Sequence, residues 1–97
     1  MPKPEAGLQS KIQTAYRKRG AWIVKIHGGP MQPKAIDLIA CYRGVFIGIE
    51  TKAKYGEGPT VRQRETLREI DAADGWTCVA HDVAEALEVL DAVDTRL

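Results

Sequence analysis

Three side chains near the middle of the 97-residue chain have the types needed for phosphate-ester chemistry: the carboxylates of Asp37 and Glu50 and the amine of Lys52. A hard divalent cation such as Mg²⁺ takes one or two carboxylates together with carbonyl oxygens, water and substrate phosphate oxygens. Such a cation acidifies a bound water and neutralises charge that develops on a phosphate, and a neighbouring lysine can orient that water. The three residues therefore indicate hydrolysis of a phosphodiester if the fold brings them together.

A predicted β-hairpin brings the two carboxylates together. Residues 36–42 and 45–52 are apolar runs on either side of Arg43-Gly44, a pattern that predicts two strands joined by a tight turn. In that register Asp37 lies directly opposite Glu50, with Cβ atoms about 4.5–5.5 Å apart. Like charges at that separation destabilise a sheet, so a counter-charge is needed, and a divalent cation is the natural one.

The same register places Lys52 beside the carboxylates, because side chains two residues apart on a strand share a face. The carbonyl of Thr51 is placed to add a ligand to the cation. Two interpretations stay open, a metal site and a salt-bridged acid–base cluster at a sheet edge, and a turn one residue longer would put Asp37 on the opposite face. The other residues predicted on this face are apolar or small, which argues against a solvated stripe: Ile39, Cys41, Phe46 and Gly48.

The remaining elements predict one α/β domain over residues 1–97. Thr60 and Gln63 fit a capping box at the start of a helix, and so do Asp82 and Glu85. The element order is αβββαβα, which predicts an αβββαβ core with a central mixed sheet flanked by helices. Besides the hairpin, we predict a helix over 5–19, a strand over 22–27, loops over 28–34 and 55–59, a helix over 60–75, a strand over 76–80 and a last helix after 82.

The composition excludes several classes of protein. With 44% hydrophobic and 28% charged residues, the chain is typical of a globular domain. It contains no run of about 18 apolar residues and no signal-peptide core, so we expect neither a membrane span nor a secreted precursor. Cys41 and Cys78 lie within apolar runs, which predicts buried, reduced thiols in a cytoplasmic protein.

The formal net charge of +1 hides a strong asymmetry along the chain. Residues 1–36 contain seven basic side chains and one acid, whereas residues 71–97 contain one basic side chain and seven acids. This asymmetry favours an anionic partner, with nucleic acid as the leading candidate, contacted by Arg17, Lys18 and Lys34. The alternative is a solvated surface on which the charges mix once the chain is folded.

Further basic residues flank the hairpin in the sequence. Lys25 and His27 alternate toward one face of the predicted strand and are candidates for contacts to phosphate near the metal. For His27 the alternative is an ordinary packed or surface position. Lys54 and Arg62 are candidates to continue a phosphate track, with a solvated face as the alternative.

The run Ile36-Asp37, followed by Glu50-Thr51-Lys52 in an αβββαβ order, resembles the PD-(D/E)xK nuclease superfamily, whose fold is restriction endonuclease-like. Within it the chain looks most like the small VRR-NUC nucleases and, more distantly, the archaeal-type Holliday junction resolvases. The glycine pair Gly28-Gly29, the strand VFIGIETK and the later Gln63 add to the resemblance. One letter departs from the pattern, because Ile36 stands where proline is usual.

The resemblance implies roles for particular residues. Asp37 and Glu50 would bind Mg²⁺ or Mn²⁺, Lys52 would assist the attacking water, and Gln63 would pack near the site. An acid in the first helix often adds to the metal shell, and Glu5 is the acid available there, with Gln9, one turn on, as the fallback. For Gln63 the capping box is the alternative that the residues themselves favour.

Together these features lead us to expect a metal-dependent DNA endonuclease. So small a domain presents little surface for reading bases, so cutting of branched DNA or a four-way junction suits it better than sequence-specific cutting. Two symmetric nicks in a junction would require a homodimer, which the resemblance to resolvases favours. The alternative is a catalytically inactive nuclease-fold module that binds DNA and recruits or positions another protein. A small stand-alone domain would also suit a phage or mobile-element genome.

Overall fold

An antiparallel hairpin forms the centre of the structure, in the register that the sequence predicts. In the computed structural model, which describes residues 4–29 and 35–97, β2 (Leu38–Tyr42) pairs with β3 (Val45–Thr51). The ladder runs from Tyr42 opposite Val45 to Leu38 opposite Ile49. Between the strands Arg43 and Gly44 both have positive φ values, +51° and +82°, as the favoured two-residue hairpin turn requires.

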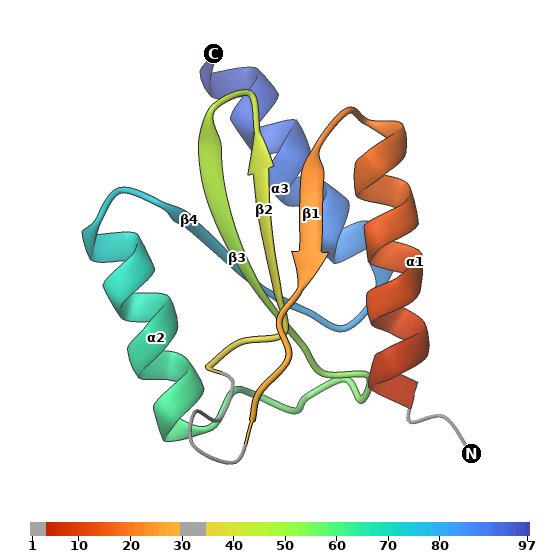
Figure 1. Cartoon of the computed structure of the whole chain (residues 1–97), viewed down its shortest axis with the longest axis vertical. Helices are drawn as coiled ribbons and strands as arrows, with labels where there is room; N and C mark the ends of the chain where they lie inside the picture. Colours follow the sequence, from red (N-terminus) through yellow and green to blue (C-terminus); the bar gives the residue numbers. More distant parts are fainter. Residues whose placement is uncertain (1–3, 30–34) are drawn as a thin grey trace.

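The hairpin is extended on both sides into a four-stranded mixed sheet of order β1-β2-β3-β4. β1 (Trp22–Lys25) pairs antiparallel with β2, and β4 (Trp76–Ala80) pairs parallel with β3. A parallel neighbour needs a crossover connection, and α2 (Val61–Ala72) supplies it. The predicted αβββαβα order and the mixed α/β sheet are thereby confirmed (Figure 1).

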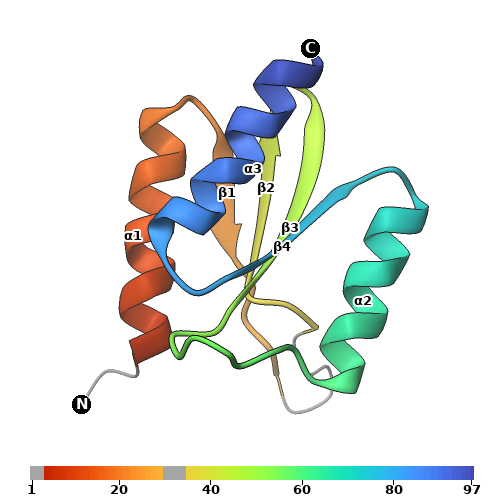
Figure 2. The same ribbon diagram turned by 180° about the vertical axis from the view of Figure 1, so that it is seen from behind.

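Helices cover the two faces of the sheet unequally. α1 (Pro4–Lys18) and α3 (Val83–Arg96) lie side by side and enclose the main core, in which Ile12, Tyr16 and Leu90 are fully buried (Figure 2). α2 packs on the other face, where a Cβ at Gly48 would come within 2.6 Å of Ile70 Cδ1. Glycine at this position therefore lets α2 approach β3.

The face that carries α2 stays open over β1 and β2, which corrects one prediction. Cys41 is exposed rather than buried, because it lies between two exposed aromatic residues, Trp22 and Phe46, in the strand register. Cys78 on β4 is partly buried. No helix formed by residues 4–29 or 35–97 is long and apolar enough to cross a membrane.

The two ends of the β2–β3 hairpin have different surroundings. We call the end with Arg43 and Gly44 the turn end, and the end with Asp37 and Thr51 the open end. The turn end lies beside the C-terminal end of α3, and the open end lies toward the start of α1 (Figure 1). At the open end the strands are shorter than predicted, since β1 stops at Lys25 and β2 begins only after Asp37.

Candidate metal and catalytic site

The open end of the hairpin gathers buried polar side chains. Asp37 directly precedes β2, and Glu50 and Thr51 close β3. Their exposed fractions are 4%, 2% and 1%, respectively. Removing ionised carboxylates from water is costly unless they are hydrogen-bonded or neutralised by another charge. The sequence prediction that these acids do not belong to a solvated stripe is therefore confirmed.

Asp37 reaches this end differently from the sequence prediction. The ladder stops at Leu38 opposite Ile49, so Asp37 is not a cross-strand partner of Glu50. Its backbone N–H donates to the carbonyl of Ile49 over 3.2 Å, and its Oδ2 accepts from Thr51 N over 2.9 Å and from Thr51 Oγ1 over 2.6 Å. Two hydrogen bonds to one carboxylate oxygen fix the orientation of Asp37 against β3.

Thr51 contributes its side chain, which sequence reasoning missed. Its hydroxyl donates to Asp37 and accepts from Gln9 Nε2 over 3.0 Å, so it joins α1 to the strand end. The sequence prediction used only the carbonyl of Thr51. The one available signal was a hydroxyl residue placed between Glu50 and Lys52 in an otherwise apolar strand.

From α1 it is Gln9, the fallback of the sequence prediction, that reaches Thr51. Gln9 is only 4% exposed, and its Oε1 is buried without a hydrogen-bond partner among residues 4–29 and 35–97. A buried carbonyl oxygen left in this state costs about 1–3 kcal/mol, so it is a natural ligand position. Glu5 lies one turn earlier, in the first turn of α1, and is half-buried.

Lys52 lies next to Glu50, as the sequence predicts. Its Nζ is 3.6 Å from Glu50 Oε2, and its side chain is 16% exposed. This distance is within reach of an ion pair but longer than a hydrogen bond. The backbone N–H of Lys52 donates to the carbonyl of Ala80 over 3.0 Å, which extends the parallel pairing of β3 and β4 by one step.

The donor set at the open end fits a hard cation. It offers the carboxylates of Asp37 and Glu50, the amide oxygen of Gln9 and the backbone carbonyl of Thr51, and Mg²⁺ or Mn²⁺ completes such a set with water and substrate oxygens. Within residues 4–29 and 35–97 no group of three His, Cys, Asp or Glu side chains is arranged to hold a metal. The proposed set contains oxygen donors only, whereas structural zinc sites are built mainly from cysteine and histidine.

Gln63 forms the capping box that the residues themselves favour. Thr60 Oγ1 accepts from Gln63 N over 3.2 Å, and Gln63 Oε1 accepts from Thr60 N over 2.9 Å. The amide oxygen of Gln63 is thus engaged in starting α2. A role for Gln63 near the metal stays a prediction.

Several of the predicted phosphate contacts belong to segments at or next to the open end. Lys25 ends β1, and the N–H of the next residue, Ile26, donates to the backbone carbonyl of Asp37 over 2.8 Å. Lys25 and the exposed His27 therefore flank the residue that pairs with the Asp37 backbone. Lys54 is exposed in the loop after Lys52. Arg62 is exposed in the first turn of α2. Lys34 lies outside the described residues.

The other predicted basic residues lie far from the site. Arg17 and Lys18 end α1, about 12 Å along the helix from Gln9 at a rise of 1.5 Å per residue. Arg17 Nη2 also donates to the carbonyl of Ile23 over 3.4 Å. A contact between these two residues and phosphate at the open end therefore requires a long nucleic-acid footprint.

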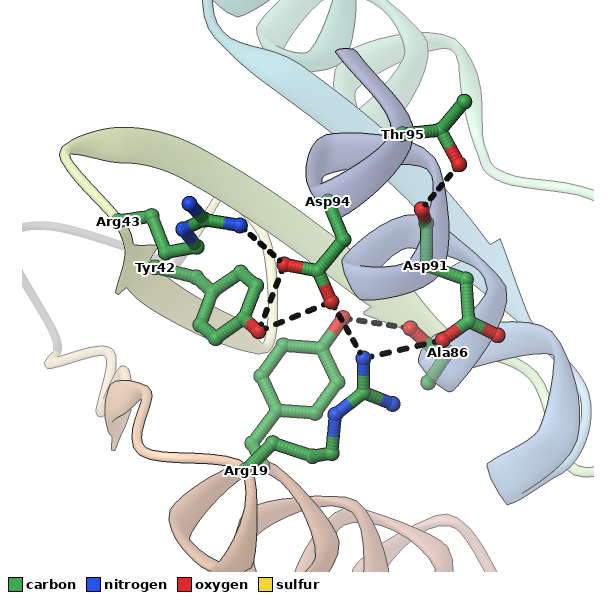
Figure 3. A network of polar contacts seen from close by, with 8 residues as sticks. Arg19, Tyr42, Arg43, Ala86, Asp91, Asp94 and Thr95 are labelled. Atoms are coloured by element: carbon green, nitrogen blue, oxygen red, sulfur yellow. Dashed lines mark hydrogen bonds and ion pairs between the residues drawn. The ribbon is translucent and has the colours of Figure 1, made fainter. Parts of the chain in front are cut away.

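At the turn end, charges from the two halves of the sequence meet in space (Figure 3). Asp94 accepts from Arg19 over 3.0 Å, from Arg43 over 2.9 Å and from the Tyr42 hydroxyl over 2.9 Å. Arg19 also pairs with Asp91 over 3.0 Å. The guanidinium of Arg43, with Tyr42 and Arg19, holds the pKa of Asp94 below its usual value. Here the mixing of charges that the sequence left open as an alternative is confirmed.

The arrangement of elements and site now defines a class of fold. A solved structure described as a VRR_NUC domain superposes on this chain with a TM-score of 0.78, over 93% of this chain and 97% of that chain, at 16% sequence identity. No family model matches the sequence, and neither does any curated protein. At this identity the similarity shows the fold, so the chain has the fold of a VRR_NUC domain, as its resemblance to VRR-NUC nucleases implies.

Proposed function

We propose that the protein is a metal-dependent DNA endonuclease that hydrolyses phosphodiester bonds in branched DNA, such as a Holliday junction. One observation carries the proposal: two nearly fully buried carboxylates, Asp37 and Glu50, lie at one end of a VRR_NUC-type fold, where Lys52 pairs with Glu50. Burying two acids at the end of a sheet costs stability. A function that uses both charges explains why they are there.

The residues that would hold Mg²⁺ or Mn²⁺ are Asp37, Glu50, the carbonyl of Thr51 and the amide oxygen of Gln9. When bound, the ion supplies charge neutralisation at the scissile phosphate and an acidified water. Glu5, in the first turn of the same helix as Gln9, is proposed as a further carboxylate for the metal shell, reached through water.

The chain itself orients the reacting groups. Thr51 holds Asp37 in one orientation through its N–H and hydroxyl. Lys52 is placed by Glu50 so that its amine donates either to the attacking water or to a non-bridging phosphate oxygen. Gln63 is proposed to support the site from the start of α2.

DNA is proposed to approach the open end. Lys25, His27, Lys54 and Arg62 provide phosphate contacts there, and such contacts are independent of sequence and weaken steeply with salt. Lys34 is proposed to add to them, and Arg17 and Lys18 to hold the far part of a long footprint.

Structure-selective cutting follows from the size of the domain, which leaves little surface for reading bases beyond the phosphate contacts. A homodimer is proposed to supply the second active site that two symmetric nicks require. Sedimentation of the protein at the concentration used for cleavage tests this part separately. A monomer that nicks both strands of a junction symmetrically would exclude the dimer.

A cleavage assay tests the proposal. Purified protein is incubated with a four-way junction, a flap and a linear duplex, in Mg²⁺, in Mn²⁺ and in chelator. We expect products from the branched substrates with metal and none with chelator. Asp37→Asn and Lys52→Ala should bind DNA but lose cleavage, whereas Asp91→Asn at the turn end should keep it. Binding without cleavage by the parent protein would instead support the inactive DNA-binding module.

A further inference from the structure

His81, between β4 and α3, contacts the loop that follows Lys52. Its Nδ1 is 2.8 Å from Glu85 Oε1, in the first turn of α3. Its Nε2 is 2.8 Å from the backbone carbonyl oxygen of Glu57, in the middle of the loop over residues 52–59. The imidazole therefore bridges a helix start and a loop that are distant in the sequence.

Both partners of the imidazole are acceptors. A carbonyl oxygen can only accept a hydrogen bond, and Glu85 Oε1 already accepts from the backbone N–H of His81 over 2.6 Å. Each ring nitrogen must then carry a proton in order to donate. A neutral imidazole carries only one N–H, so the two contacts together require the imidazolium form of His81.

The loop is tied to the same place by its aromatic residue. The Tyr55 ring stacks on the imidazole, with centroids 5.7 Å apart and an interplanar angle of 21°. The Tyr55 hydroxyl donates to the carboxylate of Asp82, the N-cap of α3. Within the loop the N–H of Glu57 donates to the carbonyl of Lys54 over 3.2 Å. The contacts of His81 and Tyr55 thus fasten the turn that carries Lys54.

The fastened loop belongs to the proposed site. It begins with Lys52, whose amine lies near Glu50, carries Lys54 in the middle and ends at Thr60, the N-cap of α2. No contact described for His81 reaches the reacting groups themselves. Any effect of His81 on catalysis must therefore pass through the position of this loop.

We propose that the imidazolium of His81 is a positioning residue, which holds the 52–59 loop against the start of α3 so that Lys52 and Lys54 face the carboxylate site. Its effect on cleavage rests on the proposed nuclease function. The contact between His81 and the loop does not, and it can be measured without DNA.

The acidic and carbonyl groups that face His81 favour its charged form. Asp82 and Glu85 face it from the start of α3, and the Tyr55 ring and the Glu57 carbonyl face it from the loop. The Cys78 thiol on β4 donates to the carbonyl of Glu85. Val83, two residues after His81 in the sequence, lines a surface hollow together with two cations of α1, Lys11 and Lys18. The hydrogen bond to the Glu57 carbonyl, and next the one to Glu85, raise the pKa of His81 above its usual 6.5.

The sign of the pH dependence follows from that shift. A group with a raised pKa in the folded state contributes its full stabilisation below the unfolded value and loses it as the pH rises through the folded value. The His81 contact is therefore complete below pH 6.5 and weakens above the folded pKa of His81. The Tyr55–Asp82 contact does not change in this range, because the pKa of Asp82 is lowered and that of Tyr55 is raised.

NMR on the metal-free protein tests the contact directly. The imidazole nitrogens of His81 and the backbone amides of Tyr55 to Gly58 are followed from about pH 5 to pH 9. We expect the loop amides to shift with the midpoint of His81, above 6.5. Glu85→Gln should lower this midpoint, and His81→Gln should abolish the transition. Loop amides that ignore the titration of His81 would overturn the proposal.

Cleavage kinetics then test the consequence for the site. The parent protein should lose several-fold in kcat/KM as the pH rises through the His81 midpoint, and His81→Gln should lack that step while keeping the other limbs of the profile. If His81→Gln lowers Tm but still shows the fall in kcat/KM at the same pH, the role of His81 is merely structural and the proposal is overturned. If no substrate is cleaved but the loop titrates with His81, the nuclease function fails and the contact between His81 and the loop stands.

Discussion

The two ends of the hairpin hold carboxylates in opposite ways. At the turn end Asp94 is partly exposed and accepts from two guanidinium groups at 2.9–3.0 Å (Figure 3). At the open end Asp37 and Glu50 are almost fully buried, and Asp37 accepts from the N–H and hydroxyl of Thr51. The turn end is arranged as a balanced ion-pair network that ties α1 and the hairpin to α3. The open end instead gathers buried acidic side chains.

This difference suggests that the residues that stabilise the fold and the residues proposed to carry the function lie at opposite ends of the hairpin. A single exposed ion pair contributes little to the stability of a fold, whereas a network of several charges contributes more. Buried carboxylates cost stability unless another charge is brought to them. The turn end therefore serves the fold, whereas the open end is where we propose that a cation and DNA bind. Substitutions at the two ends should give opposite patterns of stability and activity.

The largest expected effect comes from a matched pair of substitutions. Asp37→Asn should lower cleavage by more than about 100-fold, because it removes a proposed metal ligand, while leaving the thermal stability unchanged or higher. Asp94→Asn should keep cleavage and lower Tm. Initial cleavage rates and thermal unfolding of both variants check this prediction. Equal loss of activity in the two variants would erase the distinction between the ends.

The next effect concerns the hydroxyl that joins Gln9 to Asp37. Thr51→Val keeps the shape of the side chain but removes this bridge, so it should reduce cleavage by about 10–100-fold through the loss of a group that orients a metal ligand. Thr51→Ser, the matched control, should stay within a few-fold of the parent. If the valine variant cleaves like the serine variant, the bridge does not orient Asp37.

The register of the hairpin could be predicted from sequence because it depends on local signals. Arg43-Gly44 is a turn that fixes the pairing of the two apolar runs on either side of it. The five pairs from Tyr42–Val45 to Leu38–Ile49 follow from these signals alone. The strand over 76–80 was predicted with its observed bounds for the same reason.

The details of the site could not be predicted, because they depend on long-range packing. Extrapolating the ladder by one pair put Asp37 opposite Glu50, but the side chain turns to Thr51. The hydrogen bond from Gln9 to Thr51 depends on where α1 crosses the end of β3, which no local pattern encodes. The exposure of Cys41 likewise depends on α2 covering only part of one face.

The third expected effect concerns a buried hydrogen bond between α1 and α3. The Tyr16 hydroxyl donates to the carbonyl of Ala86 over 2.6 Å, and both residues are fully buried. Tyr16→Phe should lower the free energy of unfolding by about 1–3 kcal/mol without changing kcat, since the contact lies between α1 and α3. Urea unfolding and cleavage rates check both parts. A lower kcat at full folding would couple this core contact to the open end.

The smallest expected effect is on how the stability of the protein falls at acid pH, through the ion pairs of Asp94 at the turn end. Asp94 has a lowered pKa, so its ion pairs stabilise the fold above its unfolded value of 3.8 and are lost as the pH falls through the lower folded value. As the pH is lowered, the urea concentration at the unfolding midpoint should therefore fall less in Asp94→Asn than in the parent protein. Identical pH profiles for the parent and the variant would show that the network contributes nothing measurable.

The most direct test of the central claim is a calorimetric titration of Mn²⁺ into the metal-free protein, with Asp37→Asn and Asp94→Asn as a matched pair. If the open end is the metal site, the parent and Asp94→Asn bind Mn²⁺ with the same affinity, and Asp37→Asn binds at least about tenfold more weakly. Equal Mn²⁺ affinity in Asp37→Asn and the parent would contradict the account, because the buried carboxylates would then not hold the cation.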